Sequence, residues 1–98
     1  MSPSTAMPMP TIAFYTRAGC HLCQESRVRL QAILEERAAA GRTPCRIEER
    51  ALTEDPAWER RYMDQIPVIV VDDQELPLAL SARAIREFLA RTLDAHLA

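Results

Sequence analysis

The chain has 98 residues, of which 48% are hydrophobic and 27% are charged, and its formal net charge is −2. This length favours one domain with a single modest core, and so small a charge, spread along the chain, argues against a nucleic-acid partner. No apolar run approaches the roughly 18 residues of a membrane-spanning helix, so we expect no membrane partner either.

The N-terminal segment and the cysteine count both bear on where the protein works. Met1–Pro10 contains three prolines and no basic residue, and it lacks the apolar core of an export signal. We interpret it as a flexible leader and residues 11–98 as the folded domain. Three cysteines are too few for a secreted disulfide scaffold. These features predict a cytoplasmic protein, which we expect to be a monomer.

The first strand and the first helix follow the leader directly. Thr11–Thr16 is predicted to be a strand covered on both faces, because bulky and β-branched residues occupy nearly every position. Residues 17–19 interrupt it. From Cys20 to about Ala40 the spacing of apolar residues becomes helical, and Gly41 can close the helix. The apolar stripe of this helix consists of Leu30, Ile33, Leu34 and Ala38.

An edge strand and a short helix come next. In Cys45–Leu52, apolar and charged residues alternate, which is typical of a strand with one wet face. We interpret its residues 48–50 as a charged edge that discourages aggregation. A parallel return to the first strand would complete a right-handed crossover. Asp55 then caps a short helix that has Pro56 at its first position and ends near Asp64.

The last third of the chain predicts a hairpin and a helix. Pro67–Val71 is a compact apolar strand, residues 72–74 form a turn, and Glu75–Leu78 pairs back as a short strand. Ser81 caps a final amphipathic helix. The resulting order, β-α-β-α-β-β-α, predicts an α/β fold in which a four-stranded mixed sheet is flanked by three helices on both faces.

A Cys-x-x-Cys motif, Cys20 to Cys23, lies where the first strand gives way to the first helix. The first cysteine faces the unpaired N–H groups and the positive dipole end of the helix. Thiols in this setting have pKa values of roughly 3.5–7.5, against about 8.5 for free cysteine. The motif therefore predicts thiol-disulfide exchange, in which Cys20 attacks a disulfide and Cys23 resolves the mixed disulfide. His21 either stabilises the Cys20 thiolate or is a solvent-facing spacer.

Each of these signals has a structural alternative. The cysteine pair could be half of a zinc site, but the other ligands would have to come from Cys45, His21 and His96, so we expect no metal site. Cys45 is more typical of a small core residue than of a redox thiol. Trp58 and Tyr62 could form a docking patch, although such pairs more commonly pack onto a sheet.

The segment Phe14–Cys23, followed by Ile66, Pro67 and Val68, resembles the glutaredoxin-like branch of the thioredoxin superfamily. The likeness covers nearly the whole chain after the leader. It implies a thioredoxin-like fold and a thiol-disulfide oxidoreductase that needs no bound cofactor. In these proteins the matching proline is cis and faces the dithiol. The resemblance therefore implies that Pro67 is cis and that the Ile66 backbone meets an extended substrate near Cys20.

The resemblance is weaker at the residues that bind glutathione in glutaredoxins. Arg17 matches a basic residue that helps glutaredoxins hold a glutathione carboxylate, whereas the Gly-Gly turn that binds the γ-glutamyl end is replaced by Leu78, Ala79 and Leu80. We therefore expect a disulfide-bearing protein or a small thiol compound as substrate, with glutathione as a candidate reductant. Two alternatives are a redoxin-fold binding module that meets its partner through residues 66–68, and a metal or iron-sulfur protein using Cys20.

Overall fold

The computed structural model describes residues 9–94, and its elements follow the predicted order. They are β1 (Thr11–Thr16), α1 (His21–Ala39), β2 (Arg46–Ala51), the short 3-10 helix η2 (Leu52–Glu54), α2 (Pro56–Tyr62), β3 (Val68–Val71), β4 (Gln74–Leu76) and α3 (Ala82–Leu93). The predicted boundaries are displaced by at most two residues, and η2 is additional. Most of the predicted leader, the last four residues of the predicted domain and His96 lie outside the described residues.

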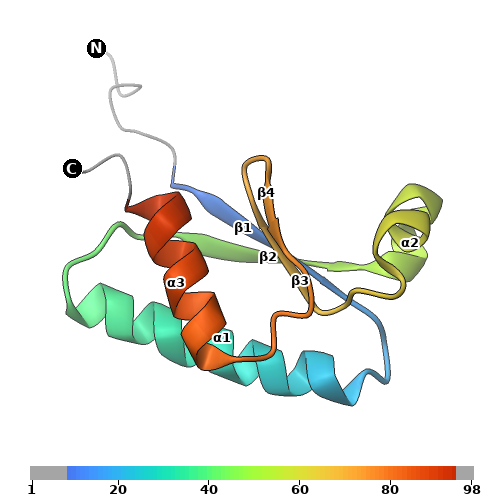
Figure 1. The fold of residues 1–98 in the computed structure, drawn as a ribbon, viewed down its shortest axis with the longest axis horizontal. Coiled ribbons are helices and arrows are strands. Elements are labelled where there is room, and N and C mark those ends of the chain that lie inside the picture. Colours follow the sequence, from blue (N-terminus) through green and yellow to red (C-terminus); the bar gives the residue numbers. More distant parts are fainter. Residues whose placement is uncertain (1–8, 95–98) are drawn as a thin grey trace, which may run out of the picture.

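The four strands form one mixed sheet in the order β2-β1-β3-β4 (Figure 1). β1 pairs in parallel with β2, as the predicted crossover requires, and antiparallel with β3, which forms the predicted hairpin with β4. In this register Tyr15 of β1 lies between Arg50 of β2 and Val68 of β3. The end of β1 and the start of β3 therefore lie at the same end of the sheet.

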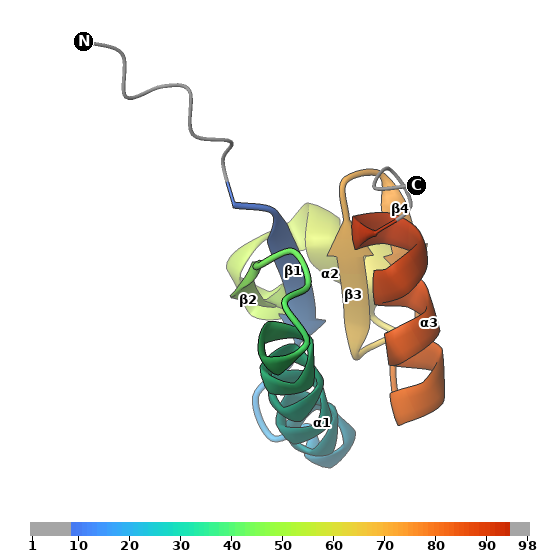
Figure 2. The same cartoon turned by 90° about the vertical axis from the view of Figure 1, so that its left-hand side faces the viewer.

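The two faces of the sheet carry separate cores, because successive side chains of a strand point to opposite faces. Ile12 and Phe14 belong to the larger cluster, to which α1 and α3 also contribute. Ala13 and Tyr15 belong to the smaller cluster, which includes Tyr62 of α2. Figure 1 shows α2 well apart from α3, and Figure 2 shows α3 next to β3 with α1 nearer β1 and β2. The predicted cover of both faces is thus confirmed.

Trp58 and Tyr62 pack onto the sheet, as predicted. The Tyr15 ring lies 4.5 Å from the Tyr62 ring and 5.5 Å from the Trp58 ring, measured between centroids. Asp55 caps α2 by accepting a hydrogen bond from the backbone of Ala57. These contacts fix α2 against β1, the strand that leads to the cysteine motif.

The buried face of α1 differs from the predicted stripe. Leu30 and Ile33 are buried as expected, but Ala38 is exposed, and the buried face continues instead toward the N-terminus through Ser26 and Cys23. At about 100° per residue, Ala38 lies about 140° around the helix from Ile33, which takes it away from the sheet. None of the helices in the described part of the chain has both the length and the hydropathy required to cross a bilayer.

Candidate functional site

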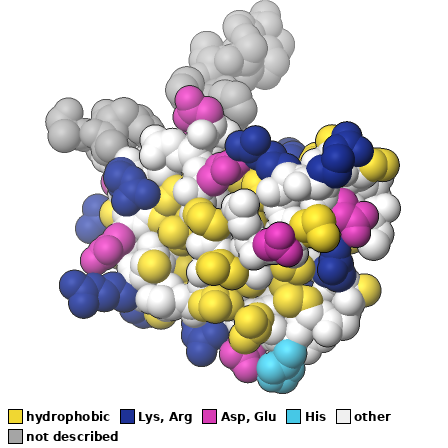
Figure 3. Space-filling model, turned by 45° about the vertical axis from the view of Figure 1, so that its right-hand side comes forward, with side chains coloured by type: hydrophobic (Ala, Val, Ile, Leu, Met, Phe, Trp, Pro, Cys, Tyr) yellow, Lys and Arg dark blue, Asp and Glu magenta, His cyan; other side chains and the backbone are white. Residues whose placement is uncertain are grey.

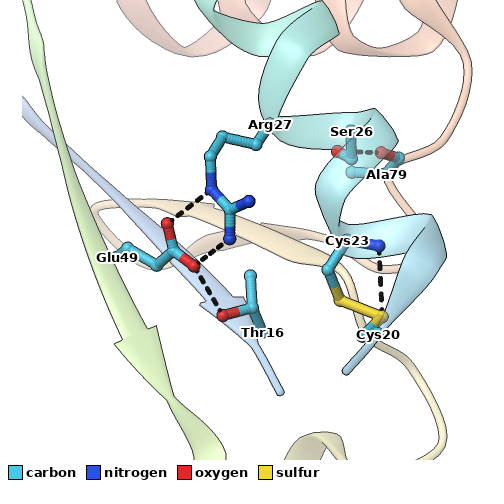
Figure 4. Close-up of a disulfide and its surroundings, with 7 residues drawn as sticks. All are labelled: Thr16, Cys20, Cys23, Ser26, Arg27, Glu49 and Ala79. Carbon is cyan, nitrogen blue, oxygen red and sulfur yellow. Dashed lines mark hydrogen bonds and ion pairs between the residues drawn. A yellow bond between two sulfur atoms is a disulfide. The ribbon is translucent and has the colours of Figure 1, made fainter. Parts of the chain in front are cut away.

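Cys20 and Cys23 lie at the N-terminal end of α1 and are joined by a disulfide, with 5.2 Å between their Cα atoms (Figure 4). Cys20 is the N-cap residue, and its Sγ accepts a hydrogen bond of 3.1 Å from the backbone N–H of Cys23. Cys20 is half-buried, whereas Cys23 is only 1% exposed. One sulfur can therefore be reached from solvent while the other is covered, and the reachable one faces the helix terminus.

A tight turn delivers Cys20 from the end of β1 to this position. The backbone N–H of Cys20 donates to the carbonyl of Arg17 at 3.2 Å, and Gly19 has a φ of +77°, a conformation that glycine adopts without steric cost. The Cys20 carbonyl then accepts the N–H of Gln24 at 3.1 Å, which begins the hydrogen-bonded helix. The short interruption predicted at residues 17–19 therefore positions the first cysteine.

The two charged residues predicted near the cysteines each have an acidic partner. The guanidinium of Arg17 contacts the carboxylate of Glu59 on α2 at 3.0 Å. His21 is exposed, and its Nε2 lies 3.0 Å from the carboxylate of Glu25, one helical turn along. The ion pair between Arg17 and Glu59 was not predicted, because the two residues are far apart in the sequence.

The Ile66-Pro67 peptide bond is cis, as the resemblance implies. Pro67 and Val68 are buried, and Ile66 is half-buried. The carbonyls on either side of Ile66, those of Gln65 and Pro67, accept hydrogen bonds of 2.8 Å from the N–H groups of Leu78 and Ala79. No backbone hydrogen bond of Ile66 itself is found within residues 9–94. The N–H and C=O of Ile66 thus have no backbone partner within these residues, and they lie at the end of the sheet that carries the cysteine loop.

Ser26 links α1 to this segment. Its hydroxyl is fully buried and donates a hydrogen bond of 2.6 Å to the carbonyl of Ala79, whose N–H in turn donates to Pro67 (Figure 4). Ser26 follows Cys23 by three residues and lies on the same face of α1. The sequence reasoning missed Ser26, although a small polar residue in register with Cys23 was a usable signal.

Glu49 forms a second link, between α1 and the sheet. It accepts hydrogen bonds from the Thr16 hydroxyl at 2.9 Å and from Nε of Arg27 at 2.8 Å, with a further contact to a terminal nitrogen of the same guanidinium (Figure 4). The hydrogen bond from Arg27 lowers the pKa of the Glu49 carboxyl and raises that of the guanidinium. Residues 48–50 lie on the edge strand β2, and Glu49 is exposed, in agreement with the predicted charged edge. The ion pair of Glu49 with Arg27 of α1 was not predicted.

Cys45 lies just before β2 and is half-buried, with its side chain packed against the larger core cluster. Burial raises the pKa of its thiol. These contacts agree with the predicted role as a small core residue. Across residues 9–94, no three potential metal-ligating side chains come together.

Exposed hydrophobic side chains accompany the site. Leu22, within the motif, is 47% exposed, and Leu78, which follows β4 and has a φ of +50°, is 54% exposed. Figure 3 shows hydrophobic side chains gathered beside the histidine, and His21 is the histidine within the described residues. The surface around the disulfide is thus largely apolar.

Comparison with known families identifies the chain. The model of the glutaredoxin-like domain (DUF836) matches residues 11–96. The chain belongs to this glutaredoxin-like family. The match covers all the elements from β1 to α3, together with both cysteines of the motif. No curated protein matches the sequence.

Solved structures share the fold of this glutaredoxin-like domain. A structural genomics target protein from X. campestris is 24% identical, and the match covers 82% of this chain and 96% of that one with a TM-score of 0.63. A Nitrosomonas europaea protein solved by NMR is 23% identical, and the match covers 85% of this chain and 94% of that one with a TM-score of 0.64. Thioredoxin 1 from Thermosipho africanus is 15% identical, and the match covers 90% of this chain and 99% of that one with a TM-score of 0.64. At these identities the similarities establish the thioredoxin fold and nothing finer.

Proposed function

We propose that this glutaredoxin-like domain is a thiol-disulfide oxidoreductase that reduces disulfides of proteins or small molecules. The observation that carries the proposal is the asymmetry of the cysteine pair. Cys20 is reachable, and its sulfur accepts a backbone N–H at the positive end of α1, while Cys23 is covered and within bonding distance. N–H groups at a helix N-terminus favour a negative sulfur over a neutral thiol, so Cys20 is the nucleophile.

The exchange proceeds in two displacements that leave the sulfur bonds balanced. The Cys20 thiolate attacks one sulfur of the substrate disulfide, and the other sulfur leaves as a thiolate that takes a proton from water. Cys23 then gives its proton to solvent and attacks Cys20 Sγ, which releases the second substrate thiol and closes the Cys20–Cys23 disulfide. Two electrons pass to the substrate. Two molecules of a small thiol such as glutathione then restore the dithiol by two further exchanges and leave as their own disulfide, without any bound cofactor.

The segment at residues 66–68 supplies the substrate groove in this proposal. The backbone of Ile66 has no backbone partner within the described residues, although the carbonyls on both sides of it are engaged. An extended peptide can pair with such a free edge through main-chain hydrogen bonds. Pro67 and Val68 form the buried floor, and Arg17 lies on the loop that leads to Cys20.

Three cysteine variants test the mechanism. Cys20→Ser is expected to abolish reduction of a model protein disulfide, whereas Cys23→Ser is expected to accumulate a mixed disulfide at Cys20 that mass spectrometry detects. Cys45→Ser is the matched control, because it removes a thiol outside the motif and should leave turnover unchanged. Turnover by Cys20→Ser at the wild-type rate would overturn the proposal. Cellular partners captured by Cys23→Ser would identify the client.

A second candidate function is partner binding with little catalysis, and the exposed side chains of Leu22 and Leu78 favour it. Monomeric proteins seldom leave large apolar patches uncovered, so such residues beside a groove are typical of a docking surface. The two functions differ in their dependence on sulfur. Tight capture of a partner that is unaffected by Cys20→Ser, together with slow exchange against every disulfide tried, would favour binding over catalysis.

A further inference from the structure

We propose that Glu59 sets the charge preference of the dithiol site, by holding the Arg17 guanidinium so that disulfides without a carboxylate beside the reacting sulfur are favoured. The inference rests on the proposed function and specifies its substrate class. It assigns Glu59 a role in specificity, although Glu59 lies on α2, outside the motif and outside the residues 66–68 segment.

The backbone of Arg17 lies next to that of Cys20. The hydrogen bond from the Cys20 N–H to the Arg17 carbonyl closes a tight turn, and the Cα atoms of the first and fourth residues of such a turn lie within about 7 Å of one another. A cation at this place would attract a carboxylate carried near a substrate disulfide. The charge on Arg17 is therefore the one that decides between acidic and neutral substrates.

Glu59 removes most of that attraction. Its carboxylate lies 3.0 Å from the Arg17 guanidinium, and α2 fixes its position, because the Glu59 N–H bonds to the carbonyl of the cap residue Asp55 at 3.1 Å. The two side chains are 44% and 38% exposed, so an incoming carboxylate would meet a cation that is already neutralised and a like charge beside it. Such a substrate is disfavoured, while a neutral one is unaffected.

The other charges and the apolar side chains near the cysteines point the same way. His21 is paired with Glu25, and Leu22 within the motif is exposed to solvent. Leu78 is also exposed, and its N–H bonds to the carbonyl that precedes Ile66. The surroundings of the disulfide therefore present charged groups that already have partners, together with uncovered apolar groups. A neutral, apolar segment of a protein next to its disulfide is the substrate that this surface complements.

The test compares three small disulfides of similar size that differ in charge. They are dithiodipropionate, which is anionic, hydroxyethyl disulfide, which is neutral, and cystamine, which is cationic. Full-length protein is reduced with dithiothreitol, the reductant is removed, and the rate constant for loss of the dithiol is measured by acid quenching and thiol labelling. Glu59→Gln is expected to raise the anionic-to-neutral rate ratio by about threefold at low salt and to lower the cationic-to-neutral ratio.

Two further variants separate this role from a general effect of charge or folding. Glu36→Gln removes the same charge from a comparably exposed pair with Arg86, 2.9 Å away, and lies 16 residues along α1 from Cys20, about 24 Å, so it should leave both ratios unchanged. In Arg17→Gln/Glu59→Gln both charges are absent, and the anionic-to-neutral ratio should return close to the wild-type value. Salt should suppress the effect of Glu59→Gln, because exposed charges are screened beyond about 10 Å at 0.1 M.

The outcomes separate this inference from the proposed function. An unchanged anionic-to-neutral ratio in Glu59→Gln, or an equal change in Glu36→Gln, would overturn the role of Glu59 while leaving the exchange reaction standing. If the wild-type protein reacted neither with the three small disulfides nor with the model protein disulfide, the oxidoreductase itself would be refuted and the selectivity with it. If Glu59→Gln raised the rate constants with all three disulfides by the same factor, the change would lie in the reactivity of Cys20, and the charge preference would also be refuted.

Discussion

Ser26 on α1 donates a buried hydrogen bond of 2.6 Å to the carbonyl oxygen of Ala79, which lies 53 residues further along the chain. The N–H of Ala79 donates in turn to the carbonyl of Pro67. A continuous set of hydrogen bonds therefore joins the helix that carries the cysteines to the segment that contains the cis Ile66-Pro67 bond. The substrate site proposed at residues 66–68 depends on this connection, because the two segments are far apart in the sequence and a side-chain hydrogen bond joins them.

Ser26→Ala is expected to lower the free energy of unfolding by about 1–3 kcal/mol, because the buried Ala79 carbonyl would lose its side-chain partner. The loop at residues 77–80 would also be less firmly held, so we expect slower reduction of a protein disulfide. Urea unfolding of the oxidised protein measures the first effect, and turnover measures the second.

Gln24→Ala is the matched control for Ser26→Ala, because Gln24 is exposed on the same part of α1. Surface substitutions usually change stability by less than about 0.5 kcal/mol, so this variant should unfold like the wild type. Equal stability of Ser26→Ala and Gln24→Ala would contradict the structural role of the bond. Lower stability with unchanged turnover would instead show that the reaction does not require this hydrogen bond.

Glu49 predicts a loss of stability in acid. The hydrogen bond from Arg27 lowers the folded-state pKa of Glu49 below its ordinary value of 4.5. A lowered pKa stabilises the fold above the ordinary value, and this contribution disappears as the pH falls through the folded-state pKa. Glu49→Gln should therefore be less stable than the wild type at pH 7, and the difference should shrink as the solution is acidified below pH 4.5.

Chemical denaturation at a series of pH values measures this difference. Glu35→Gln serves as the control, since Glu35 is an exposed residue of α1 and its replacement removes the same charge. A gap between Glu49→Gln and the wild type that stays constant with pH would mean that the carboxylate does not act through its ionised form.

The sequence was sufficient to predict the four strands, the three α-helices and their order, because each of these elements is encoded by neighbouring residues. The alternation in β1, the cap at Asp55 and the cap at Ser81 are local signals, and Ser81 does accept the Ala84 N–H as predicted. The position of Cys20 at a helix N-terminus followed from the same reasoning. The prediction that Ala38 belongs to the buried stripe of α1 was wrong, because an exposed alanine and a buried one look alike in a periodic pattern.

The contacts that build the site could not be predicted in this way. Glu59 reaches Arg17 across 42 residues of sequence, and Glu49 reaches Arg27 across 22. Such pairs depend on the register of β1 with β2 and on where α2 rests, and many charged pairings are compatible with one sequence. Local patterns therefore indicated which residues react, whereas the partners that tune them required the three-dimensional structure.

The ion pair between Arg37 and Asp94 predicts that replacing one partner lowers the stability more than replacing both. The guanidinium donates to both carboxylate oxygens, at 3.1 and 2.8 Å, and the two side chains are only 11% and 14% exposed. Removing one partner of such a covered pair typically costs roughly 3–5 kcal/mol, because the remaining buried charge loses its main partner. The loss of stability in Arg37→Met should lie at the low end of this range, since Arg42 remains 4.0 Å from Asp94.

The double variant Arg37→Met/Asp94→Leu should recover most of the stability that Arg37→Met loses, because well-packed apolar residues often replace a covered ion pair without cost. Thermal and urea unfolding of the two variants and of Asp94→Leu complete the cycle. If the double variant were less stable than both single variants, the pair would contribute through its geometry and not through the avoidance of an unpaired charge.

Cys45 provides the last prediction, which concerns chemical reactivity. Burial raises the pKa of its thiol above the ordinary value, so at neutral pH it carries less thiolate than a free cysteine. The thiolate is the reactive species, and Cys20 is expected to ionise more easily at the terminus of α1. Limited alkylation of the reduced protein with iodoacetamide should therefore modify Cys20 well before Cys45, as peptide mapping by mass spectrometry would reveal. Faster modification of Cys45 would contradict both its burial and the assignment of Cys20 as the nucleophile.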